Sequence, residues 1–217
     1  MIQNYKDYIK EQQHLDVDPF DEEDWKIDNL SPLLQIVRKE YGNTPYDEIT
    51  KLDCCGKELL SLEGVENLVN LEVLYCDDNQ LTSLEGIENL VNLEVLSCPI
   101  NQLTSLEGIE NLVNLEKLYC DYNRLTSLED MENLVNLIEL VCSGNQLTSL
   151  EGIENLVNLN ELYCGSNQLT SLKGIENLVN LKKLCCGGNN FNKAYKNHLK
   201  NYCKNKDISL TIYDTEL

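Results

Sequence analysis

Histidine is scarce in this chain, and so are the motifs that usually accompany catalysis. The sequence has two histidines, His14 and His198, and neither stands beside a nucleophile motif. Histidine is the side chain whose ordinary pKa suits proton transfer near neutral pH. A glycine-rich phosphate loop and a G-x-S-x-G elbow are also missing. We therefore expect no enzymatic activity, no catalytic residue and no cofactor.

Positive charge is scarce as well. The chain has 17 Lys and Arg against 37 Asp and Glu, which gives a net charge of −20. An acidic surface of this kind repels phosphate backbones, which are bound through Lys and Arg. It also repels anionic lipids. Nucleic acid and membranes are therefore not expected partners.

Long apolar runs are absent too. No stretch of the sequence is long enough and apolar enough to span a bilayer. The first residues, MIQNYKDYIKEQQ, lack the apolar core of a secretory signal. A chain from which a signal had been removed would look the same. As it stands, the sequence predicts an intracellular, cytoplasmic protein.

What the chain does contain is a sequence repeat of 22 residues, present in seven consecutive copies at constant spacing. The clearest copy covers residues 71–92, LEVLYCDDNQLTSLEGIENLVN. A fixed period in this range indicates a solenoid, in which each unit buries its apolar face against its neighbours. The copies begin at Ile49, Leu71, Leu93, Leu115, Leu137, Leu159 and Leu181.

Each copy predicts a strand, a corner and a return segment. The alternation around Leu74 and Cys76 suits a short strand that points these two side chains inward. Asn79 follows at the corner, where its amide can satisfy backbone groups that would otherwise be buried without partners. After it, apolar residues recur every third position, which favours 3₁₀ turns over a regular α-helix. The stacked coils would align their strands in a parallel sheet, about 4.8 Å apart.

The motif LxxLxCxxNxLTSLEGIENLVN resembles the leucine-rich repeat family over about residues 49–192. It is most similar to the 22-residue class of type 1 phosphatase regulators and bacterial internalins, and to near-identical repeats of viral and microbial families. The resemblance implies an α/β fold: a curved right-handed solenoid with a parallel sheet on its concave face and 3₁₀ turns on its convex face. It also implies protein binding on the concave sheet, and it does not imply a reaction.

The sequences at the two ends of the chain differ from the repeat and predict caps for the solenoid. We expect a helical N-terminal cap over residues 1–48, seven repeats over 49–192 and a C-terminal cap over 193–217. Ser31 and Pro32, followed by LLQIVRKEYG, have the pattern of a capped helix ending at a glycine. A shorter helix is expected near residues 2–13. Lys193–Cys203 predicts a second cap helix, and ISLTIYD at 208–214 predicts a strand beside it.

A column of cysteines replaces the third leucine of the repeat. Buried side by side, these cysteines would act as small apolar residues. In-register parallel strands hold neighbouring Cβ atoms farther apart than a disulfide prefers, and burial opposes thiolates that could bind metal. Reduced packing cysteines are the favoured interpretation, with redox and metal roles as alternatives. The column comprises Cys54, Cys76, Cys98, Cys120, Cys142, Cys164 and Cys186.

Two further groups have the residue types of a metal site without its spacing. Cys185, His198 and Cys203 lie near one end, but they do not form the two tight ligand pairs of a zinc site. The acidic segment DVDPFDEED at 16–24 lacks the spacing and glycine of an EF-hand loop. The repeated glutamates are interpreted as a solvated acidic face. No metal site is predicted, and a metal at the end cysteines and His198 stays open.

The copies differ mainly at outward positions around the strand, whereas LTSLEGIENLVN barely changes. Tyrosine recurs in every second copy, which places these rings about 10 Å apart along one line of the sheet. Tyrosine is a good interface anchor, and nearby aspartates would favour a basic partner. The alternative is duplication followed by drift. The predicted partner-binding residues are Tyr75, Asp77, Asp78, Tyr119, Asp121, Tyr122 and Tyr163.

The sequence therefore predicts a non-enzymatic module that binds a protein or peptide, with a basic character, on its concave face. A structural or self-assembling scaffold is the alternative from another class, and the sequence leaves the oligomeric state open. A regulator of an enzyme such as a phosphatase is a weaker alternative, because it rests on the resemblance alone.

Overall fold

The computed structural model describes residues 30–212, and the statements below concern this part of the chain. The helix expected near residues 2–13 and the acidic segment at 16–24 lie outside it. Within it, no helix combines the length and the apolar character needed to cross a membrane. The divisions expected at 48/49 and 192/193 stay predictions.

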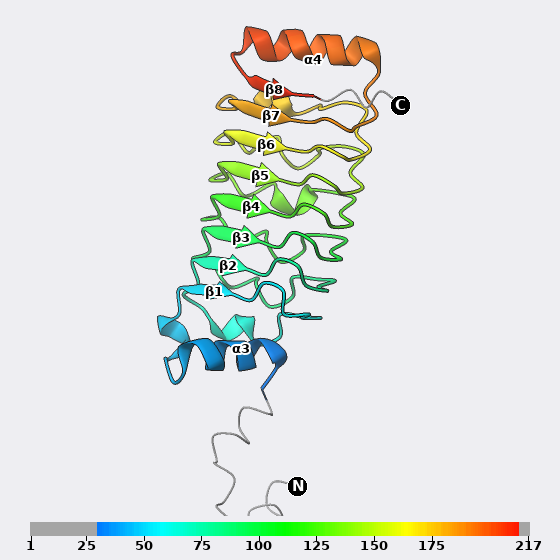
Figure 1. The fold of residues 1–217 in the computed structure, drawn as a ribbon. Coiled ribbons are helices and arrows are strands. Elements are labelled where there is room, and N and C mark those ends of the chain that lie inside the picture. The colour runs from blue at the N-terminus through cyan, green and yellow to red at the C-terminus, as the bar shows by residue number, and fades with distance from the viewer. Residues whose placement is uncertain (1–29, 213–217) are drawn as a thin grey trace, which may run out of the picture. The chain divides into compact units, whose positions relative to one another are not determined.

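Eight short strands form one parallel sheet in which chain order equals spatial order (Figure 1). The strands of the seven repeats pair at a shift of one repeat, so that Leu52 lies beside Leu74 and Leu74 beside Leu96. Strict register of this kind is what a fixed sequence period requires. The strands are β1 Lys51–Asp53, β2 Val73–Tyr75, β3 Val95–Ser97, β4 Lys117–Tyr119, β5 Glu139–Val141, β6 Glu161–Tyr163, β7 Lys183–Cys185 and β8 Ser209–Thr211.

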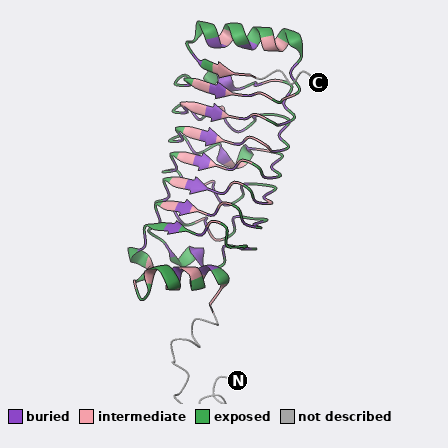
Figure 2. Cartoon of the chain, viewed as in Figure 1, coloured by how far each residue is buried: buried purple, intermediate pink, exposed green. Residues whose placement is uncertain are grey.

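Each strand from β1 to β7 buries its central leucine and turns its two flanking residues outward, whereas Leu210 in β8 is half-buried. In β2, Leu74 is fully buried while Val73 and Tyr75 are half-buried. The same buried band runs through all the coils (Figure 2). Inside it, the leucines of the return segment and the cysteines after the strands complete one continuous apolar core. The predicted inward direction of Leu74 and Cys76 is confirmed.

The return segments are chains of three-residue turns, as their period of three predicts. In the coil of β2, the N–H groups of Ile87, Leu90 and Leu93 bond to the carbonyls of Leu84, Ile87 and Leu90, respectively. The turn becomes a regular 3₁₀ helix at Val65–Asn67, Glu129–Met131 and Ile175–Asn177. A further 3₁₀ turn, Tyr46–Glu48, precedes β1.

Some of the repeated glutamates have a structural role that the sequence interpretation missed. In five coils a glutamate accepts a hydrogen bond from the N–H of the glycine two residues earlier, for example Glu66 from Gly64 at 2.9 Å and Glu154 from Gly152 at 2.8 Å. These carboxylates satisfy turn donors, so they are not merely solvated. The other glutamates of this kind are Glu88, Glu110 and Glu176.

A ladder of asparagines ties each corner to the coil before it. The amide of Asn79 donates to the carbonyls of Cys76 in its own coil and Cys54 in the preceding coil, at 3.0 and 2.9 Å. Its oxygen accepts from the N–H of Leu59, also in the preceding coil, at 2.9 Å. The predicted satisfaction of buried corner groups is therefore confirmed. The remaining members are Asn101, Asn123, Asn145, Asn167 and Asn189.

The helix α3, Pro32–Tyr41, closes the first coil (Figure 1). The Ser31 hydroxyl caps it by accepting from the N–H of Leu34 at 3.3 Å, as predicted. Leu33 and Val37 are buried. Two hydroxyls attach the helix to the first coil: Ser31 donates to the carbonyl of Glu63, and Tyr41 donates to that of Lys51.

The other end is closed by α4, Lys193–Asn205, and by β8. The helix begins after Asn192, whose side chain accepts from the N–H of Tyr195 at 2.8 Å. The predicted strand at the C-terminal end is present as β8. It does more than lie beside the helix: it pairs in register with β7 and adds an eighth strand to the sheet. The helix α4 packs against β8.

Candidate binding surface on the outer face of the sheet

The outer face of the sheet is formed by the two outward-pointing residues of each strand. One column, here called the tyrosine column, consists of Asp53, Tyr75, Ser97, Tyr119, Val141, Tyr163, Cys185 and Thr211. The second, here called the charged column, lies two residues earlier in each strand and consists of Lys51, Val73, Val95, Lys117, Glu139, Glu161, Lys183 and Ser209.

The structure brings Tyr75, Tyr119 and Tyr163 into one column on alternate strands. Ser97 and Val141 separate them in the register, and Ser97 is only 5% exposed. All three tyrosines are half-buried. Their rings therefore offer apolar area with restricted side-chain freedom, which reduces the entropic cost of binding.

The charged column holds these tyrosines in place. Tyr119 donates to a carboxylate oxygen of Glu139 at 3.0 Å, and Tyr163 donates to Glu161 at 2.5 Å. Lysines lie over two of the rings, with the Nζ of Lys51 5.3 Å from the centre of Tyr75. Lys183 lies 4.9 Å from the centre of Tyr163 and 3.3 Å from the carboxylate of Glu161. Sequence reasoning missed this column, although residues two apart in a strand share a face.

These contacts decide which oxygens carry charge. Burial, followed by the hydrogen bond to Glu139, raises the pKa of Tyr119 to about 12. The hydrogen bond to Glu161 raises the pKa of Tyr163, and the same bond lowers the pKa of the Glu161 carboxyl. At neutral pH Tyr119 and Tyr163 therefore carry hydroxyls, not phenolates.

Aspartates lie just beyond the C-terminal ends of the strands. Asp77 and Asp121 are half-buried and occupy the same slot two coils apart, with Pro99 between them. Burial raises the pKa of Asp121, and the negative charge of Asp77 adds to this. Within residues 30–212, Oδ1 of Asp77 is buried and has no hydrogen-bond partner. A buried acceptor left unpaired is costly, and neither aspartate forms an ion pair with a described residue.

Asp78 and Tyr122 lie in the turn after the strand and not on the sheet face itself. Asp78 and Tyr122 occupy the same position of the repeat, and the backbone at this slot is left-handed in each of the seven coils. The φ angle is 52° at both Asp78 and Tyr122. Glycine occupies the slot in three coils, and Ile100 takes it at a φ of 54°. Tyr122 is 63% exposed and Ile100 53%. The slot, here called the left-handed row, consists of Gly56, Asp78, Ile100, Tyr122, Gly144, Ser166 and Gly188.

The cysteine column lies in the core behind the sheet, fully buried. The thiol of Cys76, for example, donates to the carbonyl of Ser97 at 3.2 Å. Burial raises the pKa of these thiols, to about 12 for Cys54, Cys142 and Cys186, so they are uncharged at neutral pH. Their predicted packing role is in keeping with this position.

Metal-ligating residues do not gather in the described part of the chain. Among residues 30–212, no group of three or more His, Cys, Asp or Glu is arranged to hold a metal ion. Cys185, His198 and Cys203 are therefore not brought together as a site. Cys185 belongs to the tyrosine column, whereas Cys203 is buried in α4 and His198 is exposed on it.

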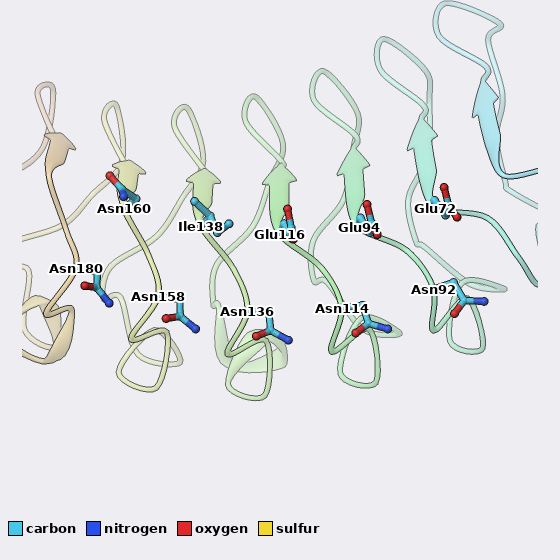
Figure 3. Close-up of a pocket in the computed structure, with 10 residues that line it drawn as sticks. All are labelled: Glu72, Asn92, Glu94, Asn114, Glu116, Asn136, Ile138, Asn158, Asn160 and Asn180. Carbon is cyan, nitrogen blue, oxygen red and sulfur yellow. The ribbon is translucent and has the colours of Figure 1, made fainter.

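A polar groove of about 760 Å³ runs along the side where the chain enters the strands (Figure 3). One wall is formed by asparagines of successive coils, each of which donates to a valine carbonyl of the preceding coil, as Asn114 does to Val91 at 2.8 Å. Sequence reasoning attached no role to this wall. The groove is lined by Glu72, Asn92, Glu94, Asn114, Glu116, Asn136, Ile138, Asn158, Asn160 and Asn180.

Known structures share the fold of this chain. An internalin C2 of Listeria monocytogenes superposes with a TM-score of 0.69 at 24% identity, over 85% of this chain and 86% of the other. The internalin InlF of the same organism gives 0.62 at 21% identity, over 78% and 57%. At these identities the likeness shows the fold. The functional domain of InlJ, described as including a cysteine ladder, gives 0.59 at 28% identity, over 78% and 40%.

The chain thus spans 57% of InlF and 40% of the InlJ domain. A comparison with curated proteins gave no match. A family model described as "Leucine Rich repeats (2 copies)" matches residues 91–133, 135–177 and 157–201. These matches cover more than half of the chain, and the register, the asparagine ladder and the parallel sheet supply the physical basis for them. The chain belongs to the leucine-rich repeat family.

Proposed function

We propose that this chain is a non-enzymatic interaction module whose outer sheet face binds a protein or peptide of basic character. Leucine-rich repeat folds commonly mediate protein–protein interaction, which makes binding the first expectation for this fold. The observation that carries the proposal is the tyrosine column. Three half-buried rings lie on one line of an in-register sheet, held by carboxylates and lysines of the charged column.

The basic character of the partner is proposed from unmatched negative charge. Asp77 keeps a buried oxygen without a partner among the described residues, and Asp121 has a raised pKa. A Lys or Arg from a partner would offset the repulsion between the two carboxylates. Complementary charge mainly accelerates association and makes it sensitive to salt. Nucleic acid and anionic membranes are proposed as non-partners for the same reason.

Affinity capture from the source cell, followed by binding of the purified captured protein, tests the proposal. Replacing Tyr75, Tyr119 and Tyr163 together by alanine should weaken binding at least about tenfold, because the apolar anchors of the interface are removed. Raising the salt concentration should weaken binding of the wild type further.

The matched control replaces three exposed valines of the return segments, Val91, Val113 and Val157, by alanine. Their exposure of 43–46% allows truncation with little effect on the core. Both variants should keep the circular dichroism of the wild type. Equal affinity of the tyrosine variant and the wild type for the purified partner would refute this surface.

Self-assembly is a second candidate, favoured by a specific observation. Valines in one slot of six successive coils are 43–76% exposed, and they are Val69, Val91, Val113, Val135, Val157 and Val179. Such a stripe can associate with another copy. Light scattering over a range of concentrations distinguishes the two candidates: a mass that stays monomeric excludes the scaffold, and a mass that rises and is restored to the monomer by the valine variant supports it.

Two finer predictions remain open to test. Regulation of a phosphatase rests on the family resemblance alone. A cytoplasmic location is the second. Microscopy of the tagged chain in its own cell would check the location.

A further inference from the structure

The left-handed row contains two side chains that the local backbone does not favour. We propose that Ile100 and Tyr122 form a binding hot spot for one apolar side chain of an extended peptide segment, with Lys or Arg flanking that side chain. This inference rests on the proposed function and deepens it, because it names the residues and the partner chemistry at one end of the surface.

The first argument is backbone strain. A left-handed backbone is unfavourable for residues with a Cβ, tolerated by Asp and Asn, and worst for β-branched or bulky side chains. Three coils avoid the strain with Gly56, Gly144 and Gly188, and a fourth uses Asp78. Isoleucine at this slot has the backbone geometry that suits it least. Strain of this kind, observed at an exposed position, points to a function that the side chain serves.

The second argument is that the side chain is not used for folding. Ile100 is 53% exposed and Tyr122 is 63% exposed, so neither completes the core. Replacing either residue by glycine would retain the coil, because other coils carry glycine in this slot. The apolar surface is therefore available to another molecule.

The third argument is contiguity. The backbone ladder continues past the strands, with the N–H of Asp78 bonded to Pro99 at 3.0 Å and that of Ile100 bonded to Asp121 at 3.1 Å. Residues of the left-handed row therefore follow one another at roughly the strand spacing of 4.8 Å. The ring of Tyr122 lies over Gly144, where an added Cβ would come within 2.8 Å of it. Ile100 and Tyr122 thus occupy the same slot of neighbouring coils, about one strand spacing apart, and the Tyr122 ring extends the exposed apolar surface toward Gly144, on the side away from Ile100.

The fourth argument is charge. Asp77, Asp78 and Asp121 surround this surface in the same or adjacent slots. None of the three forms an ion pair with a residue of the described range, and one oxygen of Asp77 has no hydrogen-bond partner there. An extended segment places alternate side chains about 6.7 Å apart on one face. A phenylalanine between two arginines, each two residues away, would meet the apolar surface and the carboxylates together.

The probe for the test is a short synthetic peptide with this arrangement, titrated into the full chain. Binding is followed by calorimetry and by backbone amide NMR shifts. We expect the largest shifts at Ile100, Asp121 and Tyr122. Ile100→Gly and Tyr122→Gly should each weaken binding about tenfold. A peptide with glutamines in place of the arginines should bind more weakly, and so should one with serine in place of the phenylalanine.

Ser166→Gly is the matched control, since Ser166 occupies the same slot three coils from Ile100 with a φ of 52°, against 54° at Ile100. Relief of strain should raise the Tm of Ile100→Gly and of Ser166→Gly by about 2–4 °C each. Only Ile100→Gly should then lose binding, which separates a binding role from a structural one.

Three outcomes would overturn the inference. The first is wild-type affinity in Ile100→Gly, and the second is no binding of the phenylalanine–arginine peptide. The third is shifts confined to the polar groove at Glu94 and Glu116 or to the tyrosine column. In that last case the proposed function stands and the hot spot fails. If the tyrosine triple variant keeps full affinity for the purified partner while the peptide binds at Ile100, the assigned sheet face fails instead.

Discussion

Gly152 shows how one residue adapts a coil to a change in the coil before it. In the preceding coil Asp130 occupies the slot of this glycine, and the backbone there forms the 3₁₀ helix Glu129–Met131. The carboxylate of Asp130 accepts a hydrogen bond from the N–H of Leu106 at 2.9 Å. As a result, the backbone at Leu128 lies close to Gly152. A Cβ on Gly152 would lie 2.2 Å from the Leu128 carbonyl oxygen, and φ is +107°. Neither the contact nor the conformation tolerates a side chain.

Gly152→Ala is therefore expected to lower the free energy of unfolding by about 2–4 kcal/mol, measured by urea denaturation. Gly108→Ala is the matched control. It has the same left-handed backbone, with φ of +104°, but an added Cβ would meet only the side chains of Glu88 and Ile87, both at an ordinary contact distance of 3.5 Å. It should cost only the backbone strain, about 1–2 kcal/mol. Equal losses in the two variants would show that the close approach at Leu128 is not the cause.

The cysteine column is the element whose chemistry responds to pH. Burial raises the pKa of its thiols in the folded state above the usual value of 9.0, to about 12 for Cys142. In the unfolded chain the thiols lose protons as the pH passes 9, whereas the folded chain retains them. The unfolded state then binds fewer protons, so stability falls as the pH rises. The contribution is intact below about pH 8 and is lost progressively between about pH 9 and 12.

Urea unfolding at several pH values should reveal a steep loss of stability above pH 9. Each thiol contributes up to about 1.4 kcal/mol per pH unit. Cys120→Ala removes one titrating group of the column and should flatten the slope by that amount, although it lowers stability at all pH values by creating a cavity. An unchanged slope in this variant would contradict the assignment of the pH dependence to the column.

At the scale of the whole molecule, the net charge of −20 opposes folding. Exposed glutamates occupy one slot of successive coils, as in Glu85 and Glu107, and have no described hydrogen bond to offset their repulsion. Salt shortens the Debye length from about 30 Å at 0.01 M to about 8 Å at 0.15 M. The urea midpoint should therefore rise with potassium chloride over this range.

The variant Glu85, Glu107 and Glu151→Gln tests the origin of this effect. These three glutamates differ from Glu88, Glu110 and Glu154, which cap turns and should be left in place. The neutral variant should be more stable at low salt and less sensitive to added salt. A midpoint independent of salt in the wild type would show that self-repulsion is negligible.

Much of this fold follows from the sequence because the period is strict. A shift of one repeat reproduces every strand pair from β1 to β7, so the direction of Leu74 and Cys76 and the role of Asn79 could be predicted from alternation and spacing alone. The helix ending at Tyr41 could be predicted because its cap uses local contacts of Ser31 and Gly42. The features that depend on short-range sequence patterns could therefore be predicted from the sequence.

The details of the candidate surface were less accessible. The contacts of Tyr119 with Glu139 and of Tyr163 with Glu161 differ, one crossing to the next strand and one staying within its own. Side-chain torsions decide between these, and the pattern of residues does not fix them. The left-handed row was detectable in principle from Gly56, Gly144 and Gly188 at one slot. The strain at Ile100 becomes visible only once that backbone is known.

The asparagine ladder also has a direction along the chain. Each asparagine completes the coil before its own, as Asn79 does for the carbonyl of Cys54 and the N–H of Leu59. The first coil has nothing before it to serve, and its slot accordingly holds Lys57. During synthesis a coil therefore leaves the ribosome with unsatisfied corner groups until the following asparagine has emerged. The newest coil of a nascent chain therefore always has unsatisfied groups, and in the last coil the N–H of Cys186 gains its acceptor only when the carbonyl of Thr211 in β8 has been made.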